Sequence, residues 1–283
     1  MERRRLALAL LRALPKHAVS RAAGWVAARQ LPRPLRGPAV RAFGGAVGVD
    51  FDEVRDRLDS FPSLQAFFTR ALRAGARPID PAADAFVSPC DGAWGAAGMV
   101  AQGQLLQVKG RTYSLAALLG DAAAALRFEG GAFATLYLSP RDYHRFHAPC
   151  AARVVRAAYL PGALWPVNRV GVEGIDGLFA VNERLCIFLD VCGAGEDLCL
   201  VAVGATNVGK IRVTFDDLTT NLRGAVPERR GYRDVVLAKG DELGRFEFGS
   251  TIVLVAAPAR LALDVQAPGT PLRYGARIGS LRA

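Results

Sequence analysis

The chain has 283 residues, of which 51% are hydrophobic and 22% charged, so it can build a core and is not a disordered or low-complexity chain. The five cysteines are odd in number and form no C-x-x-C pair, and only three histidines are present. These counts argue against a disulfide framework and a cysteine- or histidine-rich metal site, and they favour a reducing compartment.

The net charge of +10 is concentrated at the N-terminus. The first 45 residues contain ten arginines and lysines and one glutamate, so the remainder is close to neutral. Localised basic charge favours an anionic partner, either nucleic acid or an anionic membrane surface. No segment is long and apolar enough to span a bilayer. Arg12 interrupts the apolar run Leu6–Leu11 too early for a signal peptide, so we interpret this segment as retained.

The first 75 residues are predicted to be helical. Leucine, valine and alanine recur between the arginines at a rough helical spacing up to about residue 27. Pro32, Pro34 and Pro38 are expected to break this segment. Two further helices are expected, over Asp50–Leu58 and over Ser63–Leu72, the second with Ser63 as its N-cap.

From about Phe86 the pattern changes to short β-rich runs separated by Gly, Pro, Asn and Asp. One helical insert is expected at Ser114–Leu119. The predicted fold class is α+β, in which a basic helical region of residues 1–75 precedes a mostly antiparallel β domain of residues 76–283. The expected strands are Ala134–Leu138, Arg153–Leu160, Leu185–Val191, Leu198–Val203, Ile211–Phe215, Asp234–Leu237 and Thr251–Val255.

Two segments offer acid–base chemistry. His144 and His147 lie three residues apart after an expected strand, and histidine titrates near neutral pH, so the pair suits proton transfer. A polar loop with solvent-facing histidines would have the same spacing. Asp91 lies in the segment Ser88–Gly92, which alone indicates a turn and gains importance only if a histidine needs a carboxylate to orient it.

The third segment, around Ser250, offers a nucleophile. It indicates either a tight turn entering a buried strand or a reactive serine, although it lacks the G-x-S-x-G pattern of hydrolases. Gly249 permits a strained backbone that would bring the Ser250 hydroxyl onto the preceding carbonyl.

These segments belong to a set of nine motifs, in one order, through which the chain resembles the phosphatidylserine decarboxylase family over nearly its whole length. Two positions depart from the common family form, Phe248 in place of Leu and Cys90 in place of Ala or Val. The motifs are Phe67-Phe68-Thr69-Arg70 with Arg77-Pro78-Ile79; Pro89-x-Asp91-Gly92; Val108-Lys109-Gly110 with Tyr113 and Leu118-Leu119; Arg141-Asp142-Tyr143-His144-x-x-His147-x-Pro149; Val167-Asn168; Asn182-Glu183-Arg184; Val203-Gly204-Ala205 with Val208-Gly209; Lys239-Gly240-x-Glu242-Leu243-Gly244; and Phe248-Gly249-Ser250-Thr251.

The resemblance implies a pyruvoyl-dependent carboxy-lyase that converts phosphatidylserine to phosphatidylethanolamine and CO2. It assigns Asp91, His147 and Ser250 to autocatalytic cleavage between Gly249 and Ser250, which would yield chains 1–249 and 250–283. Ser250 would become a covalent pyruvoyl cofactor that holds the substrate as a Schiff base, and His144 would protonate the substrate α-carbon. A heterodimer of the two cleavage products, or a dimer of these, is the implied assembly.

An anionic membrane containing phosphatidylserine is then the expected partner of residues 1–75, at the cytoplasmic face of the cell membrane and without insertion across it. An exposed helical cap on the β domain is the alternative. Nucleic acid is disfavoured, because no aromatic platform or recognition motif accompanies the charge. Two other functions compete on the residues alone: a Ser-His-Asp hydrolase that never cleaves itself, and a non-catalytic lipid-binding protein.

Overall fold

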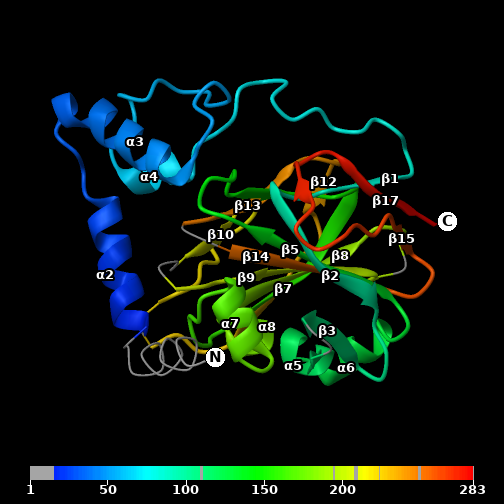
Figure 1. Ribbon diagram of the computed structural model, residues 1–283. Helices are drawn as coiled ribbons and strands as arrows, with labels where there is room; N and C mark the ends of the chain where they lie inside the picture. Colours follow the sequence, from blue (N-terminus) through cyan, green and yellow to red (C-terminus); the bar gives the residue numbers. More distant parts are fainter. Residues whose placement is uncertain are drawn as a thin grey trace.

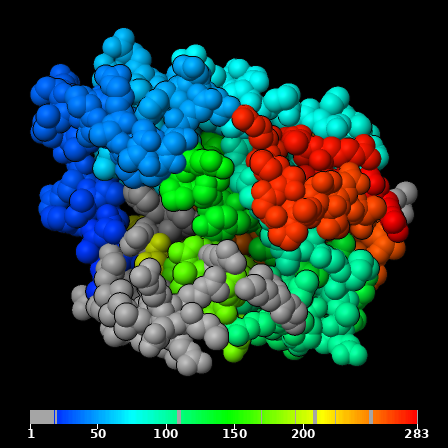
Figure 2. Space-filling model, viewed as in Figure 1, coloured from blue at the N-terminus to red at the C-terminus, as the bar shows by residue number. Residues whose placement is uncertain are grey.

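The structure is a computed structural model that describes residues 16–108, 111–193, 195–206, 210–222, 224–247 and 250–282. A helical N-terminal region lies along one side of a β-sheet body (Figure 1). Figure 2 shows this region in blue and the C-terminal segment in orange to red, with a green surface between them. Among the described residues there is no helix with the length and apolarity needed to cross a membrane.

The body is built on an antiparallel sheet of nine strands, in the order β11-β7-β8-β9-β14-β5-β2-β16, with β12 also pairing with β7. Strands β8, β9 and β14 are rich in Leu, Ile, Val and Cys, and their described side chains are buried on both faces. The strands are β2 Gly92–Met99, β5 Ala132–Leu138, β7 Ala152–Leu160, β8 Arg184–Asp190, β9 Leu198–Val203, β11 Glu228–Gly231, β12 Val236–Leu237, β14 Ser250–Ala256 and β16 Pro271–Leu272.

Side chains alternate between two apolar layers, as the period of a strand requires. Ile252 and Leu254 join one layer, whereas Val253 and Val255 join the other. The first layer is closed by two small antiparallel sheets, and the rings of Phe146 and Phe246 there are 5.1 Å apart. Their strands are β1 Ala85–Val87, β17 Arg277–Leu281 and β15 Leu261–Leu263, and β10 Ile211–Val213, β13 Glu242–Phe246 and β6 Arg145–His147.

The second layer is closed by short helices and one hairpin, which lie below the sheet in Figure 1. Ser114 caps the first of these helices by accepting a hydrogen bond from the Ala117 amide at 3.2 Å. The elements are β3 Gln104–Val108, β4 Arg111–Ser114, α5 Leu115–Leu119, α6 Ala122–Arg127, α7 Arg169–Gly174 and α8 Leu178–Val181.

The N-terminal region consists of α2 Lys16–Ala28, α3 Arg33–Val47 and α4 Leu64–Phe68. It has a small core of its own, in which Phe67 is fully buried. On α2 the polar Ser20 and the small Ala27 are buried, whereas Trp25 and Val26 are 60% and 62% exposed. The helix therefore presents Trp25 and Val26 outward.

The α+β class, the seven expected strands, the helix at Ser114–Leu119 and the Ser63 cap are confirmed. The helix expected over Asp50–Leu58 is wrong. The Asp52 amide donates to the Asp50 carboxylate at 2.9 Å, which makes a turn, and Val54 forms a β-bridge with Leu72 instead. The Ser63 helix ends early, at Phe68, and Leu72 lies in this bridge instead of the helix.

Pro38 does not break the chain as expected, because it lies inside α3. As the sixth residue of the helix, it removes one interior hydrogen bond, to the Pro34 carbonyl, and the helix continues despite this cost. Buried Val40 and Gly44 hold the rest of the helix against the region's core. The division of the chain after residue 75 stays a prediction.

Candidate active site

Ser250 begins the central strand β14, and the structure describes its backbone. It pairs with Leu138 at the end of β5, and the next residue, Thr251, pairs with Val203 at the end of β9. The chain leaving β5 turns directly into the segment that carries the two histidines. Phe248 and Gly249, and with them the expected cleavage site, lie outside the described residues.

His144 is completely buried. Its Nδ1 lies 2.8 Å from the Asp142 carbonyl oxygen, so Nδ1 carries the proton and Nε2 holds a lone pair. Nε2 is buried without a hydrogen-bond partner among the described residues, and the ring packs 4.0 Å from the ring of Phe68. Burial lowers the pKa of His144 to about 3, so the imidazole is neutral at pH 7.

His147 is also neutral and has a fixed tautomer. Its Nδ1–H donates to the Gly240 carbonyl at 2.9 Å, and Nε2 accepts from the Tyr143 hydroxyl at 3.2 Å. Burial lowers its pKa to about 4. Nε2 is therefore the basic nitrogen of this side chain. Because the histidines are 0% and 6% exposed, the alternative of a solvent-facing polar loop is wrong.

Gly240 supplies the carbonyl that fixes His147, and only glycine suits this position. Its φ of +90° lies in the left-handed region, and a Cβ would lie 2.2 Å from Cδ1 of Ile79. The same carbonyl accepts from the Tyr274 hydroxyl at 2.7 Å.

Tyr274 stands between His147 and Asp91. Its ring stacks on the imidazole with 3.8 Å between centroids and 17° between planes. Its backbone N–H donates to Asp91 at 2.9 Å. No hydrogen bond or ion pair joins Asp91 to His147 within the described part of the chain, although the triad proposed from the sequence expects one. Tyr274 is the residue that contacts both groups, and the Asp91 charge also acts through space to raise the pKa of His147 against the larger effect of burial.

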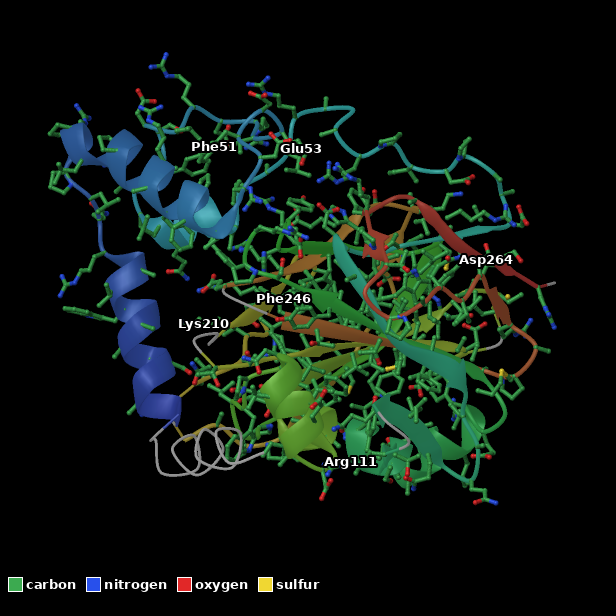
Figure 3. The ribbon with its side chains drawn as sticks, viewed as in Figure 1. Phe51, Glu53, Arg111, Lys210, Phe246 and Asp264 are labelled. Atoms are coloured by element: carbon green, nitrogen blue, oxygen red, sulfur yellow. The ribbon has the colours of Figure 1, made fainter. Side chains whose placement is uncertain are left out.

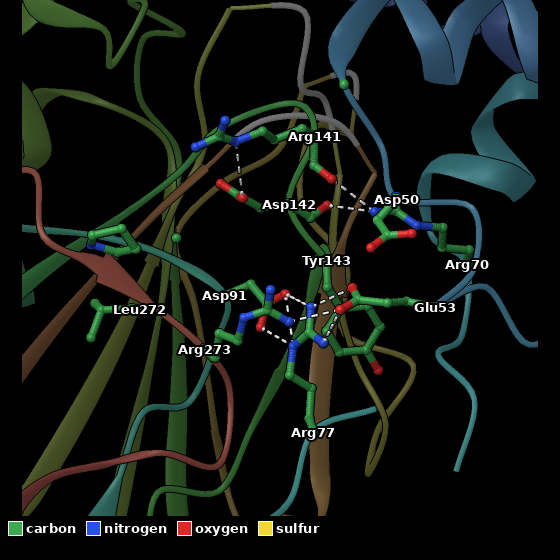
Figure 4. A pocket seen from close by; sticks show the side chains of 13 residues that line it. Asp50, Glu53, Arg70, Arg77, Asp91, Arg141, Asp142, Tyr143, Leu272 and Arg273 are labelled. Atoms are coloured by element: carbon green, nitrogen blue, oxygen red, sulfur yellow. Dashed lines mark hydrogen bonds and ion pairs between the residues drawn. The ribbon is translucent and has the colours of Figure 1, made fainter. Parts of the chain in front are cut away.

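Asp91 instead accepts from Arg77 with both oxygens, at 2.6 to 3.1 Å (Figure 4). Arg77 also donates to Glu53, which binds Arg273 at 2.7 Å. Hydrogen bonds from Arg77 lower the pKa of Glu53 to about 2. Burial opposes the charge of Arg77, but its bonds to the two carboxylates raise its pKa. This ion-pair chain joins the N-terminal region to the C-terminal segment.

The sequence did not predict the residues that surround His147 and Asp91, which are Tyr143, Tyr274 and Arg77. Arg77 and Tyr143 lie in motifs used for the family resemblance, but their spacing gave no sign of a contact with Asp91 or His147. Nothing in the sequence around Tyr274 marks it, because its role comes from a ring packed against a residue more than a hundred positions away. Among the described residues, no group of three His, Cys, Asp or Glu could hold a metal ion.

Ser250 begins a buried central strand, and the neighbouring strand β5 leads into two neutral histidines. This arrangement is typical of a protein in which a serine reacts. Residues 64–280 match the model of the phosphatidylserine decarboxylase family. The chain is 47% identical to the phosphatidylserine decarboxylase proenzyme of Anaeromyxobacter sp. (strain K), covering 97% of this chain and 98% of the relative. It is 42% identical to that of Myxococcus xanthus (strain DK1622), covering 95% and 96%. The chain belongs to the phosphatidylserine decarboxylase family.

Proposed function

We propose that the chain is a self-processing lyase that decarboxylates phosphatidylserine to phosphatidylethanolamine and CO2, with a pyruvoyl cofactor formed from Ser250. The observation that carries this proposal is the position of Ser250 at the start of β14, opposite the end of the strand that leads into His144 and His147. The name of the relatives, phosphatidylserine decarboxylase proenzyme, supports the substrate and maturation from a precursor.

The surroundings fit a group built from the chain itself. Such a group needs no separate binding pocket, but it needs a proton acceptor beside it. We assign this role to His144, whose Nε2 has no hydrogen-bond partner among the described residues. The His144 carbonyl accepts from the Phe246 amide at 2.9 Å. That bond holds the histidine segment against the chain entering residue 250.

In self-processing, Nε2 of His147 takes the proton of the Ser250 hydroxyl, because Nδ1 is already occupied by its bond to Gly240. The Tyr143 hydroxyl, which donates to this Nε2 in the structure, must first turn away. The serine oxygen attacks the carbonyl carbon of Gly249 and the amide becomes an ester. Loss of the α-proton of residue 250 then breaks the ester and frees the upstream chain as a carboxylate. Hydrolysis of the resulting unsaturated residue yields the pyruvoyl group and ammonia. Asp91 supports this base by holding Tyr274 in place against the imidazole.

In turnover, the pyruvoyl carbonyl supplies the electron sink for the electrons that are released as CO2 leaves. The substrate enters as an ammonium and must lose a proton before its amine can react. His144 is suited to take that proton at Nε2, since Nδ1 is held by the Asp142 carbonyl. It would return the proton to the substrate α-carbon after decarboxylation, which is the role expected from the resemblance.

The N-terminal region would hold the enzyme on an anionic membrane at the cytoplasmic face of the cell. The exposed Trp25 and Val26 on α2 support this, because apolar side chains of an interfacial helix enter the lipid boundary. Cleavage would leave chains 1–249 and 250–283 associated, because β14 pairs with β5 on one side and with β9 on the other.

The test is CO2 release from vesicles that contain phosphatidylserine. We expect activity that survives a metal chelator and is abolished by hydroxylamine, which reacts with ketones. Activity lost with the chelator and restored by a metal ion would contradict a covalent carbonyl cofactor.

A further inference from the structure

Arg70 is a buried cation that makes no direct ion pair in the described ranges, although the charges of Asp91, Asp142 and Glu53 act on it through space. The residue is 4% exposed, and its Nη2 donates to the carbonyl oxygens of Arg141 at 2.8 Å and Asp142 at 3.2 Å. Its Nε and Nη1 are buried and have no hydrogen-bond partner. A buried charge is stable only when it is paired or fully hydrogen-bonded. Two nitrogen atoms of this guanidinium therefore still need a hydrogen-bond acceptor.

The guanidinium lines a cavity of about 260 Å³ between the N-terminal region, the loop after β5 and the C-terminal segment (Figure 4). Since one water occupies about 30 Å³ of liquid, there is space for a small polar group. Arg141 and Arg273 also line the cavity, and their side chains are 66% and 63% exposed. They mark the side on which the cavity meets solvent.

The carboxylates around the cavity already have partners. Glu53 and Asp91 are bound by Arg77, and Asp142 accepts from the amide and hydroxyl of Ser139, both at 2.7 Å. Asp50 accepts from the amide of Asp52. The unpaired hydrogen-bonding groups at this cavity are therefore the donors of Arg70. A group with anionic oxygens would accept from them.

We propose that Arg70 and this cavity bind the head-group phosphate of the substrate, an inference that rests on the proposed function. Arg70 and His144 bond to the same carbonyl oxygen, that of Asp142, so an anion on Arg70 lies close to the proton acceptor. In a serine phosphodiester, only the side-chain carbon and one oxygen separate the phosphorus from the α-carbon. The substrate carboxylate is the poorer occupant, because an arginine that stabilised it would oppose its loss as CO2.

The experiment is calorimetric titration of inorganic phosphate, glycerophosphoserine and free serine into full-length protein with Ser250→Ala. We expect glycerophosphoserine to bind more tightly than inorganic phosphate, and serine not to bind. Arg70→Met in this background should weaken glycerophosphoserine binding by about tenfold or more, since it removes charge-assisted hydrogen bonds. The matched control is Arg111→Gln, whose ion pair with Asp176 lies at the opposite end of the molecule from Glu53 (Figure 3).

A second variant guards against a folding defect in Arg70→Met. Asp50→Asn keeps the acceptor for the Asp52 amide but removes a negative charge from the cavity, so it should tighten glycerophosphoserine binding severalfold. A structural lesion would not produce this gain. The site is overturned if Asp50→Asn brings no gain, or if folded Arg70→Met binds as the parent does. Equal affinity for inorganic phosphate and glycerophosphoserine would overturn the head-group assignment. The Ser250→Ala protein neither cleaves itself nor catalyses decarboxylation. The binding results are therefore independent of whether the parent protein is active as a decarboxylase.

Discussion

The two nitrogens and one face of the His147 imidazole each contact a different residue. The Gly240 carbonyl fixes the proton on Nδ1, the Tyr143 hydroxyl approaches Nε2, and the Tyr274 ring covers one face. Together they exclude water, and this burial is the main reason that the pKa falls to about 4. An imidazole with this pKa stays unprotonated at Nε2, and so able to accept a proton, well below neutral pH.

Tyr274→Ala should slow self-cleavage by about tenfold to a hundredfold, because His147 loses the ring that holds it. It should also change the pH profile. Opening this face to water raises the pKa of His147 towards its ordinary value, so the variant should lose rate between pH 7 and 5.5 while the parent does not. Tyr274→Phe keeps the stack and is the control. Cleavage is followed on freshly translated chain by gel; unchanged rate and profile in Tyr274→Ala would show that Asp91 acts by another path.

His144→Ala should cleave normally but decarboxylate at least a hundredfold more slowly, if its Nε2 handles the substrate proton rather than the serine proton; general acid–base catalysis contributes about 10²–10⁴-fold. His147→Ala should fail to cleave. The comparison is made by scoring each variant for fragments and for CO2 release per cleaved chain. A cleaved His144→Ala protein with normal turnover would remove this role.

At the scale of elements, β14 explains how a cleaved protein holds together. The strand lies between β9 and β5, and Ile252–Val255 are at most 1% exposed. The short fragment would also contain β15, β16 and β17, each paired with another strand. Removing it would open both apolar layers, so the two proposed chains would behave as one folding unit.

Helix α2 is the element that would meet the membrane. Replacing Trp25 and Val26 by serine should weaken binding to anionic vesicles by about tenfold or more, because large apolar side chains no longer enter the interface. Leu126→Ser on α6 is the matched control, since Leu126 is 78% exposed but lies outside the basic region. Co-sedimentation at low and high salt reports binding, beside a gel for cleavage. If the double variant sediments like the parent, α2 is a structural cap.

The long, apolar strands could be predicted from the sequence because burial on both faces leaves a continuous run of branched residues. Strand β2 could not, since its residues Gly92–Met99 are mostly glycine and alanine and it forms only through pairing with β5. In the site, the histidine spacing could be found from sequence, whereas Tyr274 and Arg70 act through contacts that only the tertiary fold creates. The same holds for Val54 and Leu72, whose bridge replaced an expected helix.

For the whole molecule, two neutral buried histidines predict a pH-dependent stability. Their folded pKa values, about 3 and about 4, lie below the unfolded value of 6.5, so the unfolded state binds more protons between these values. The free energy of unfolding should therefore fall as pH is lowered from 7.5 to 5.5. Urea denaturation of the Ser250→Ala protein measures this, and adding His147→Gln should reduce the fall. An equal fall in both proteins would contradict a buried neutral His147.

The central claim is that the chain cuts itself at Ser250 and turns this residue into its cofactor. The most direct measurement is the intact mass of the purified protein under denaturing conditions, beside the Ser250→Ala variant. We expect two chains, 1–249 and 250–283, the shorter with a pyruvoyl group in place of its N-terminal serine, and one uncut chain for the variant. An active protein that remains a single chain of 283 residues, or fragments from Ser250→Ala, would contradict the account.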